Sequence, residues 1–111
     1  MAKRSPHHQT HYTRAAATLL GQLIRRRRIE GNMTVEELAD RAGLSRPLVH
    51  RIERGDLGCS IGNVFEAATI VGLKLFDADG ERLDREISTN TSLMTLLPRS
   101  VRASTKVKDD F

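Results

Sequence analysis

The chain of 111 residues is poor in aromatic residues, which limits the kind of core it can form, and in cysteine, which excludes two classes of protein. With three Phe, one Tyr and no Trp, any core must consist of aliphatic side chains. The single cysteine, Cys59, excludes an intrachain disulfide framework and a cysteine-based zinc finger. No stretch approaches the ~18 apolar residues of a membrane span, and residues 1–13 lack the apolar core of a secretory signal. We therefore expect a cytoplasmic protein without a membrane partner.

The sequence also lacks the parts of an enzyme active site. It has no glycine-rich phosphate loop, no nucleophile with a plausible base and no carboxylate pair on a defined site. His7, His8 and His11 share a polar segment without a cysteine or carboxylate partner, which is a poor metal site. We expect a protein that is not an enzyme and that needs no cofactor and no metal.

Positive charge is unevenly distributed along the chain. Lys and Arg number 18 against 14 Asp and Glu, which gives a net charge of +4. Residues 1–59 hold eleven basic and six acidic side chains, whereas residues 60–89 hold three and six. A basic front half is what phosphate binding requires, so nucleic acid is the first partner to consider.

Apolar residues recur at helical spacing through the front two thirds of the chain. A first helix is expected to begin at Thr13 as its N-cap and to end at Gly31 and Asn32. The residues of its expected buried stripe are Ala16, Leu20, Leu23 and Ile24. A last helix of this series is expected from about Ser60 to residue 71.

Two short helices joined by a tight turn are expected between these two. Thr34 and Glu37 have the spacing of a capping box, which begins the second helix, and Gly43 ends it. Ser45 is the N-cap of the third helix, which ends at Gly55. This is the spacing of a helix-turn-helix, in which a short turn makes two helices cross steeply. The N-terminal residues of the second of these two helices can then enter the major groove of DNA.

The third helix is predicted to have an apolar inner face and a basic outer face. Its outward positions are Arg46, Pro47, His50, Arg51 and Arg54. Three arginines and a histidine suit a groove lined by phosphates. Pro47 is suited equally to starting the helix and to contacting a thymine methyl group. The run of four arginines at residues 25–28 is either a nucleic-acid patch or a solvated helix end.

Residues 20–55 resemble the Xre-type helix-turn-helix family, which includes the phage Cro and cI repressors. The matching motif consists of Thr34, Glu37, Leu38, Ala39, Gly43, Ser45, Ile52, Glu53 and Gly55. With the following helix, the resemblance covers roughly residues 18–72. It implies an all-α, Cro/cI-repressor-like bundle of four to five helices that acts as a dimer on palindromic operator DNA.

The resemblance also implies a role for individual positions. Thr34 and Ser45 would hold phosphates through hydroxyl groups and helix N-terminal amides. The residues that would face base edges are Arg46, Pro47, His50 and Arg51. Arg54 and the loop at residues 56–60 would lie near the DNA backbone, and Arg28 with Glu53 would form an internal salt bridge. Val35 stands where family members usually carry Gln, and Arg27 where they carry an apolar residue.

A short strand is predicted after the last of these helices. Leu73 and Leu75 alternate with Lys74 over residues 73–77, and an isolated strand cannot pair its own edge amides. Residues 64–83 resemble the HipB-like antitoxin branch of the Xre family. That resemblance implies a homodimer sealed by the strand residues Leu73, Lys74, Leu75 and Phe76. It also implies a C-terminal tail that is available to a HipA-like kinase toxin.

We therefore expect four parts in the chain. They are a flexible arm (1–12), a DNA-binding domain (13–72), a dimerisation strand and turn (73–87) and a flexible tail (88–111). Residues 81–87 are expected to form a short charged helix, and the apolar cluster at 93–97 either packs on the dimer or binds a partner. The expected function is that of a nucleoid-associated, sequence-specific repressor that is the antitoxin of a HipA-like kinase. The alternative is a phage or plasmid-type Xre repressor without a toxin partner.

Overall fold

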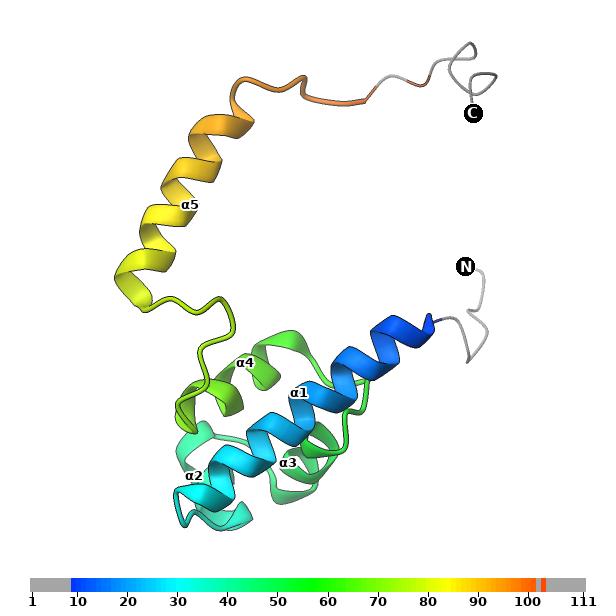
Figure 1. Ribbon diagram of the computed structural model, residues 1–111, viewed down its shortest axis with the longest axis vertical. Coiled ribbons are helices and arrows are strands. Elements are labelled where there is room, and N and C mark those ends of the chain that lie inside the picture. The colour runs from blue at the N-terminus through cyan, green and yellow to red at the C-terminus, as the bar shows by residue number, and fades with distance from the viewer. Residues whose placement is uncertain (1–8, 102, 104–111) are drawn as a thin grey trace. The chain divides into compact units, whose positions relative to one another are not determined.

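The computed structural model describes residues 9–101 and 103, and all regular structure in that part of the chain is helical (Figure 1). The helices are α1 (His11–Glu30), α2 (Val35–Ala42), α3 (Arg46–Glu53), α4 (Ile61–Ile70) and α5 (Gly80–Met94). The chain divides into two compact units, Met1–Leu75 with α1 to α4 and Phe76–Phe111 with α5. The all-α class and the number of helices were both predicted from the sequence.

The first unit is built around a small aliphatic core. The buried apolar residues are Ile24, Leu38, Ala39, Val49, Ile52, Ala67 and Ala68. They come from all four helices of the unit, and α3 packs against both α1 and α2, while α2 also packs against α4. The core is therefore aliphatic, as the shortage of aromatic residues requires.

The helix-turn-helix segment has the predicted caps. The Thr34 hydroxyl oxygen accepts from the Glu37 backbone N–H at 3.0 Å, and a Glu37 carboxylate oxygen accepts from the Thr34 N–H at 2.8 Å. Gly43 has φ of +69°, the left-handed conformation that glycine adopts without a steric penalty. Ser45 caps α3 through Leu48 at 3.2 Å, and Pro47 lies in the first turn. Local sequence signals thus fix the bend between α2 and α3.

Helix α1 begins earlier than the sequence predicted, and its buried stripe contains Leu20, Leu23 and Ile24 as predicted but not Ala16. Its N-cap is Thr10, whose hydroxyl oxygen accepts from the Thr13 N–H, so the first turn includes two residues expected in the arm. Ala16 is exposed, and Gly21 is buried instead. A Cβ atom on Gly21 would lie 2.5 Å from the Ile52 carbonyl oxygen, so α1 and α3 are in backbone contact there. The hydrophobic pattern could not show that Gly21 belongs to this face, because glycine has no side chain. Residues 1–8 of the arm lie outside the described residues.

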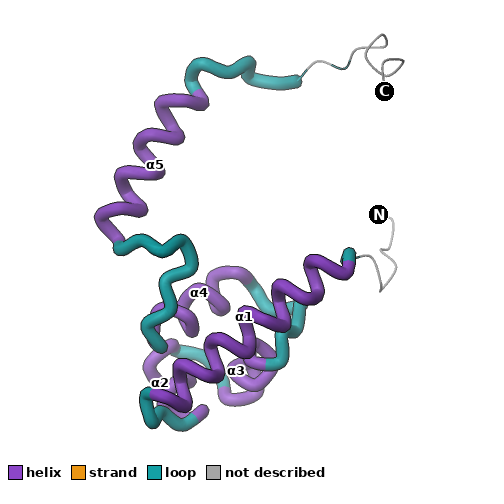
Figure 2. Tube along the Cα trace, viewed as in Figure 1, coloured by secondary structure: helices purple, strands orange, loops and turns teal. Residues whose placement is uncertain are grey.

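The strand expected at residues 73–77 is not formed in the part of the chain that the structure describes (Figure 2). Gly72, with φ of +83°, ends α4, and the Leu73 N–H donates to the Ala68 carbonyl at 2.8 Å. This is a Schellman cap, in which the residue after the glycine makes an apolar contact with the helix. Leu73 packs against the core in this way. Leu73, the first apolar residue of the alternation, therefore belongs to the end of α4.

The second unit contains a longer helix than expected. The sequence predicted a short helix at 81–87 and a flexible tail from residue 88, whereas α5 continues to Met94. Asp79 caps its start by accepting from the Arg82 N–H at 2.9 Å. Residues 88–92 of α5 are all Ser, Thr or Asn. Among them, the Thr91 hydroxyl donates to the Ile87 carbonyl at 2.7 Å and so has a partner within the helix. None of the residues of α5 is buried.

Candidate nucleic-acid interface

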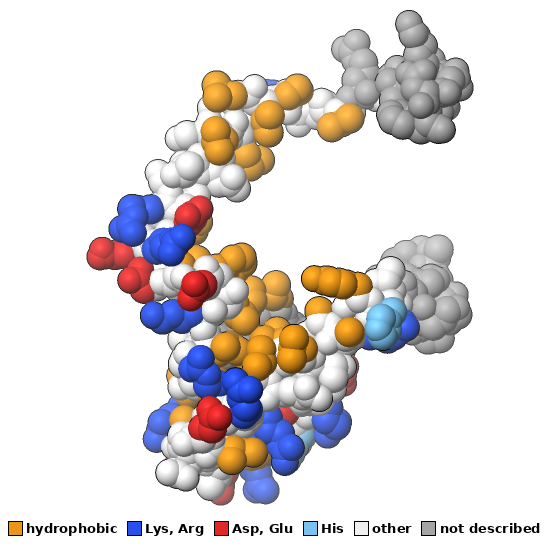
Figure 3. All heavy atoms as spheres, viewed as in Figure 1, with side chains coloured by type: hydrophobic (Ala, Val, Ile, Leu, Met, Phe, Trp, Pro, Cys, Tyr) orange, Lys and Arg blue, Asp and Glu red, His pale blue; other side chains and the backbone are white. Residues whose placement is uncertain are grey.

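Helix α3 has the two faces that the sequence predicted. Val49, Ile52 and Glu53 are buried against the first unit. The residues of the opposite face are exposed, namely Arg46, Pro47, His50 and Arg54, while Arg51 is half-buried. A two-turn helix with one face in the core and a cationic face in solvent has the form of a DNA-reading helix. Figure 3 shows basic side chains on the surface of this unit.

The two hydroxyl caps lie at the starts of α2 and α3. Each hydroxyl oxygen accepts a backbone N–H, so its own hydrogen remains available to donate to a phosphate oxygen. The first turn of α2 contains Glu36 and Glu37, whereas the first turn of α3 contains no acidic residue. The start of α3 is therefore the more electropositive of the two and the better place for a phosphate.

The position of Arg51 could not be predicted from the sequence. Its Nε donates to Asp56 Oδ2 at 2.8 Å, and the other oxygen of Asp56 accepts from the Gly58 N–H at 2.7 Å. The hydrogen bond from Arg51 lowers the pKa of the Asp56 carboxyl, and the same bond raises the pKa of Arg51. The pair therefore stays charged at neutral pH. Asp56 lies in an irregular loop, where no periodic pattern indicates the neighbour of a side chain.

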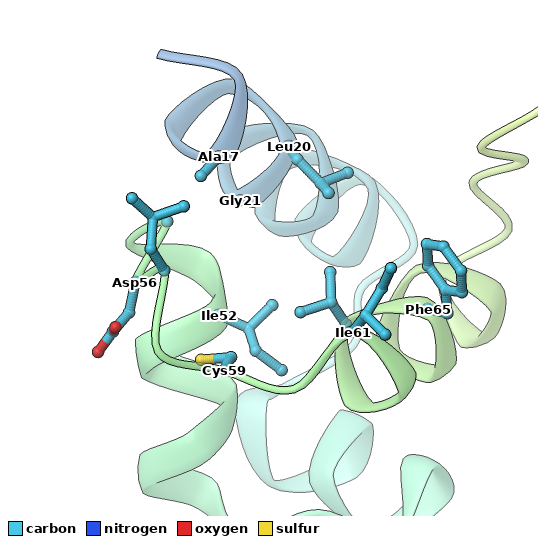
Figure 4. A pocket seen from close by; sticks show the side chains of 11 residues that line it. Ala17, Leu20, Gly21, Ile52, Asp56, Cys59, Ile61 and Phe65 are labelled. Atoms are coloured by element: carbon cyan, nitrogen blue, oxygen red, sulfur yellow. The ribbon is translucent and has the colours of Figure 1, made fainter. Parts of the chain in front are cut away.

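Figure 4 shows Asp56 at the edge of an apolar hollow that it helps to line. A hollow between α1 and α4 is lined by the side chains of Leu20, Ile52, Ile61 and Phe65 among others. The Asp56 carboxylate points away from the apolar side chains of this hollow. The carboxylate is therefore turned toward α3 and Arg51, with which it makes its hydrogen bond.

The run of arginines at the end of α1 contacts its own unit. Arg28 is buried and forms an ion pair with Glu53 at 2.6 Å, which confirms the internal salt bridge. Arg27, one of the two departures from the family pattern, donates to the Gly72 carbonyl at 3.0 Å. Arg25 Nε lies 3.9 Å from a carboxylate oxygen of Glu53, and Arg26 Nε lies 3.7 Å from a carboxylate oxygen of Glu30. These contacts favour the reading of this run as a helix end over that of a nucleic-acid patch.

The four residues expected to seal a dimer lie in different surroundings. Leu73 is partly buried against the core of its own unit. Lys74 and Leu75 are exposed, and Phe76 is 70% exposed. Leu73 thus already packs within its own chain, while Lys74, Leu75 and Phe76 remain accessible for contact with a partner.

In residues 9–101 and 103, no three His, Cys, Asp or Glu side chains come together to hold a metal ion. His7 and His8 lie outside the described residues. No helix in that described part is long and apolar enough to cross a membrane.

Comparison with known proteins assigns a family to this chain. Residues 19–85, more than half of the chain, match the family described as helix-turn-helix domain. Curated proteins give no match. Among solved structures, the chain is similar to the restriction-modification controller protein C.AhdI from Aeromonas hydrophila, with 32% sequence identity and a TM-score of 0.48. That similarity covers 54% of this chain and 91% of C.AhdI. By the match of residues 19–85, this chain belongs to the helix-turn-helix domain family of DNA-binding regulators.

Proposed function

We propose that the protein is a sequence-specific transcriptional repressor that reads double-stranded operator DNA with the outer face of α3. The observation that carries this proposal is the exposure of Arg46, His50 and Arg54 opposite a buried apolar face of the same helix. Arginine can make two hydrogen bonds to guanine in the major groove, so this face has the chemistry that base reading needs.

Each remaining site residue has a role in this proposal. Thr34 and Ser45 donate to phosphates from the starts of α2 and α3, and Arg54 contacts the backbone beyond the end of α3. Arg46, His50 and Arg51 face base edges, and Pro47 lies beside them in the first turn. Phosphate contacts set the register of the protein on DNA, while base contacts give the sequence preference.

Selection of duplexes from random-sequence DNA by the full chain tests this proposal. We expect an enriched motif and a strong salt dependence of binding. If each half-site neutralises about four phosphates, log K falls against log salt with a slope of about −7 for a dimer. Enrichment of no motif, with equal binding to all duplexes, would contradict a repressor that reads sequence.

We further propose that the repressor is a homodimer, to which Leu75, Phe76 and helix α5, which follows them in the sequence, each contribute contacts. On α5, Leu83, Ile87 and Met94 recur at helical spacing, and all three are exposed, from 37% to 62%. A helix of 15 residues is marginally stable alone in water, so burial of this stripe would stabilise it. A two-fold dimer would also match a palindromic operator.

A second part of the proposed function is that of an antitoxin for a HipA-like kinase toxin. The observation that favours it is a second exposed apolar cluster around the end of α5, within residues 93–97, where Leu93, Leu96 and Leu97 are 55–79% exposed. We expect a Leu93→Asp, Leu97→Asp chain to lose a kinase from a host pull-down and to keep its DNA binding. If no kinase is captured by the unaltered chain, the alternative of a phage or plasmid-type repressor without a toxin is favoured. Either form would act at the nucleoid.

A further inference from the structure

Arg51 differs from the other outward residues of α3 because its head is held by a neighbour. Its guanidinium Nε donates to Asp56 Oδ2 at 2.8 Å. The Asp56 backbone N–H donates in turn to the Arg51 carbonyl at 3.0 Å. Among the described residues, the side chains of Arg46, His50 and Arg54 make no such hydrogen bond. One potential base-reading side chain is thus fixed, while the others can move.

We propose that Asp56 is a positioning residue for DNA recognition, which sets base-pair specificity by orienting the Arg51 guanidinium. The inference deepens the proposed function and rests on α3 being the helix that reads DNA. Asp56 itself need not touch DNA in this scheme. Its carboxylate is also held by a second hydrogen bond, from the Gly58 N–H at 2.7 Å.

The geometry of the pair leaves the two terminal nitrogens of the Arg51 guanidinium free to bind a base. Its two terminal nitrogens make no hydrogen bond to another described residue, because the carboxylate contact is at Nε. Two terminal N–H groups match the O6 and N7 acceptors of guanine. A guanidinium that is already held loses less side-chain entropy when it binds a base. A held Arg51 therefore favours its matching base pair more than a mobile Arg51 would.

Gly58 is the second support for this arrangement. A Cβ atom at residue 58 would lie 3.1 Å from Arg51 Nη2 and 3.2 Å from Asp56 Oδ1. Both contacts are tight, so an alanine would displace the guanidinium by a few tenths of an ångström. Gly58→Ala therefore disturbs the same pair without any change in charge.

A simpler role for Asp56 predicts a different result. As a mere negative charge near the DNA, it would repel phosphates, so its removal would strengthen binding to every duplex alike. As a positioning residue, its removal lowers the preference for one base pair. The sign and the sequence dependence of the change therefore separate the two roles.

The test uses the full chain and the duplex that it selects from random-sequence DNA. The Arg51→Ala variant first identifies the base pair of the selected duplex for which binding preference is lost. Binding is then measured to duplexes that carry each of the other base pairs at that position. We expect Asp56→Ala to lower the discrimination at that pair about tenfold, and to leave the other positions unchanged. Two milder variants should each give a smaller loss of discrimination at that base pair. They are Asp56→Asn, whose side chain can still accept from the Gly58 N–H, and Gly58→Ala. Glu66→Ala, an equal charge change at an exposed site on α4, should give none.

A double-mutant cycle completes the test. In an Arg51→Ala background, Asp56→Ala should have no further effect on discrimination, because its target is gone. The inference alone is overturned if Asp56→Ala changes binding to all duplexes by one factor, or if its loss of discrimination persists without Arg51. If the unaltered chain selects no sequence at all, the proposed function is overturned and the inference with it. Thermal unfolding of each variant confirms that it is folded.

Discussion

Arg28, near the end of α1, and Glu53, at the end of α3, form a buried ion pair with two parallel hydrogen bonds. Arg28 Nε and Nη2 donate to the two carboxylate oxygens of Glu53 at 2.6 Å and 3.1 Å. Arg28 Nη1 also donates to the Met33 carbonyl, which leads into α2. One guanidinium therefore links the ends of α1 and α3 and the chain before α2. The orientation of α3 depends on this link.

Removal of one partner of this pair should be strongly destabilising. Glu53→Ala leaves a buried guanidinium without its counter-ion, and we expect a loss of about 3–5 kcal/mol in the free energy of unfolding. Arg28→Met combined with Glu53→Leu removes both charges and should recover most of that loss. Urea unfolding followed by circular dichroism measures both. A single variant as stable as the unaltered protein would contradict a buried, coupled pair.

The close approach of α1 and α3 at Gly21 predicts a second effect on stability. Gly21→Ala would place a Cβ atom 2.5–2.7 Å from the carbonyl oxygens of Ile52 and Glu53, so the helices must separate. We expect a loss of about 1–3 kcal/mol. Gly62→Ala in α4 is the matched control, because its Cβ would meet nothing within 4 Å. The control should be neutral or more stable, since alanine is the better helix former. Equal thermal shifts for the two variants would argue against the contact.

The capping box of α2 predicts a dependence of stability on pH. The backbone N–H of Thr34 donates to the Glu37 carboxylate and, as the largest cause, lowers the pKa of Glu37 below its usual 4.5. Because the folded-state pKa is lowered, this contribution is fully present above the unfolded pKa. It is lost as the pH falls through the lower folded pKa. The stability advantage over Glu37→Gln should therefore shrink between about pH 6 and about pH 3. Parallel pH profiles of the two proteins would show that the carboxylate does not cap the helix.

The stripe on α5 predicts a change in oligomeric state. Ile87→Glu places a charge in the middle of the exposed apolar face and should shift the chain toward the monomer. Sedimentation velocity measures this shift. Ser88→Glu adds the same charge at the next residue, on another side of the helix, and should leave the association unchanged. If both variants sediment as the unaltered protein does, α5 does not contribute to a dimer.

Sequence signals located the helix-turn-helix well because its boundaries are set by local chemistry. The Thr34 capping box, Gly43 and Ser45 act within a few residues, so their pattern is visible in the sequence. The start of α1 was misplaced because Thr10 and Thr13 are both acceptable N-caps. The strand expected at residues 73–77 is not formed in the described chain, where Leu73 instead closes the Schellman cap of α4.

The exposed face of α3 was predicted from the sequence, but its internal contacts were not. The outward positions of α3 follow from helical periodicity once Val49 and Ile52 are assigned to the core. The bond from Arg51 to Asp56 depends on the path of the loop after α3, which no periodicity describes. The burial of Gly21 likewise depends on the approach of two helices that are distant in sequence.

The most direct test of the central claim compares two charge-matched variants on the selected duplex by fluorescence anisotropy. Arg46→Ala with Arg54→Ala removes two cations from α3 and its end, and Arg82→Ala with Arg85→Ala removes two from α5. If α3 reads DNA, the first variant should lose about tenfold or more in preference for the selected duplex over a scrambled one, and the second should keep that preference. An equal, small loss for both variants, with the preference intact, would contradict α3 as the reading helix.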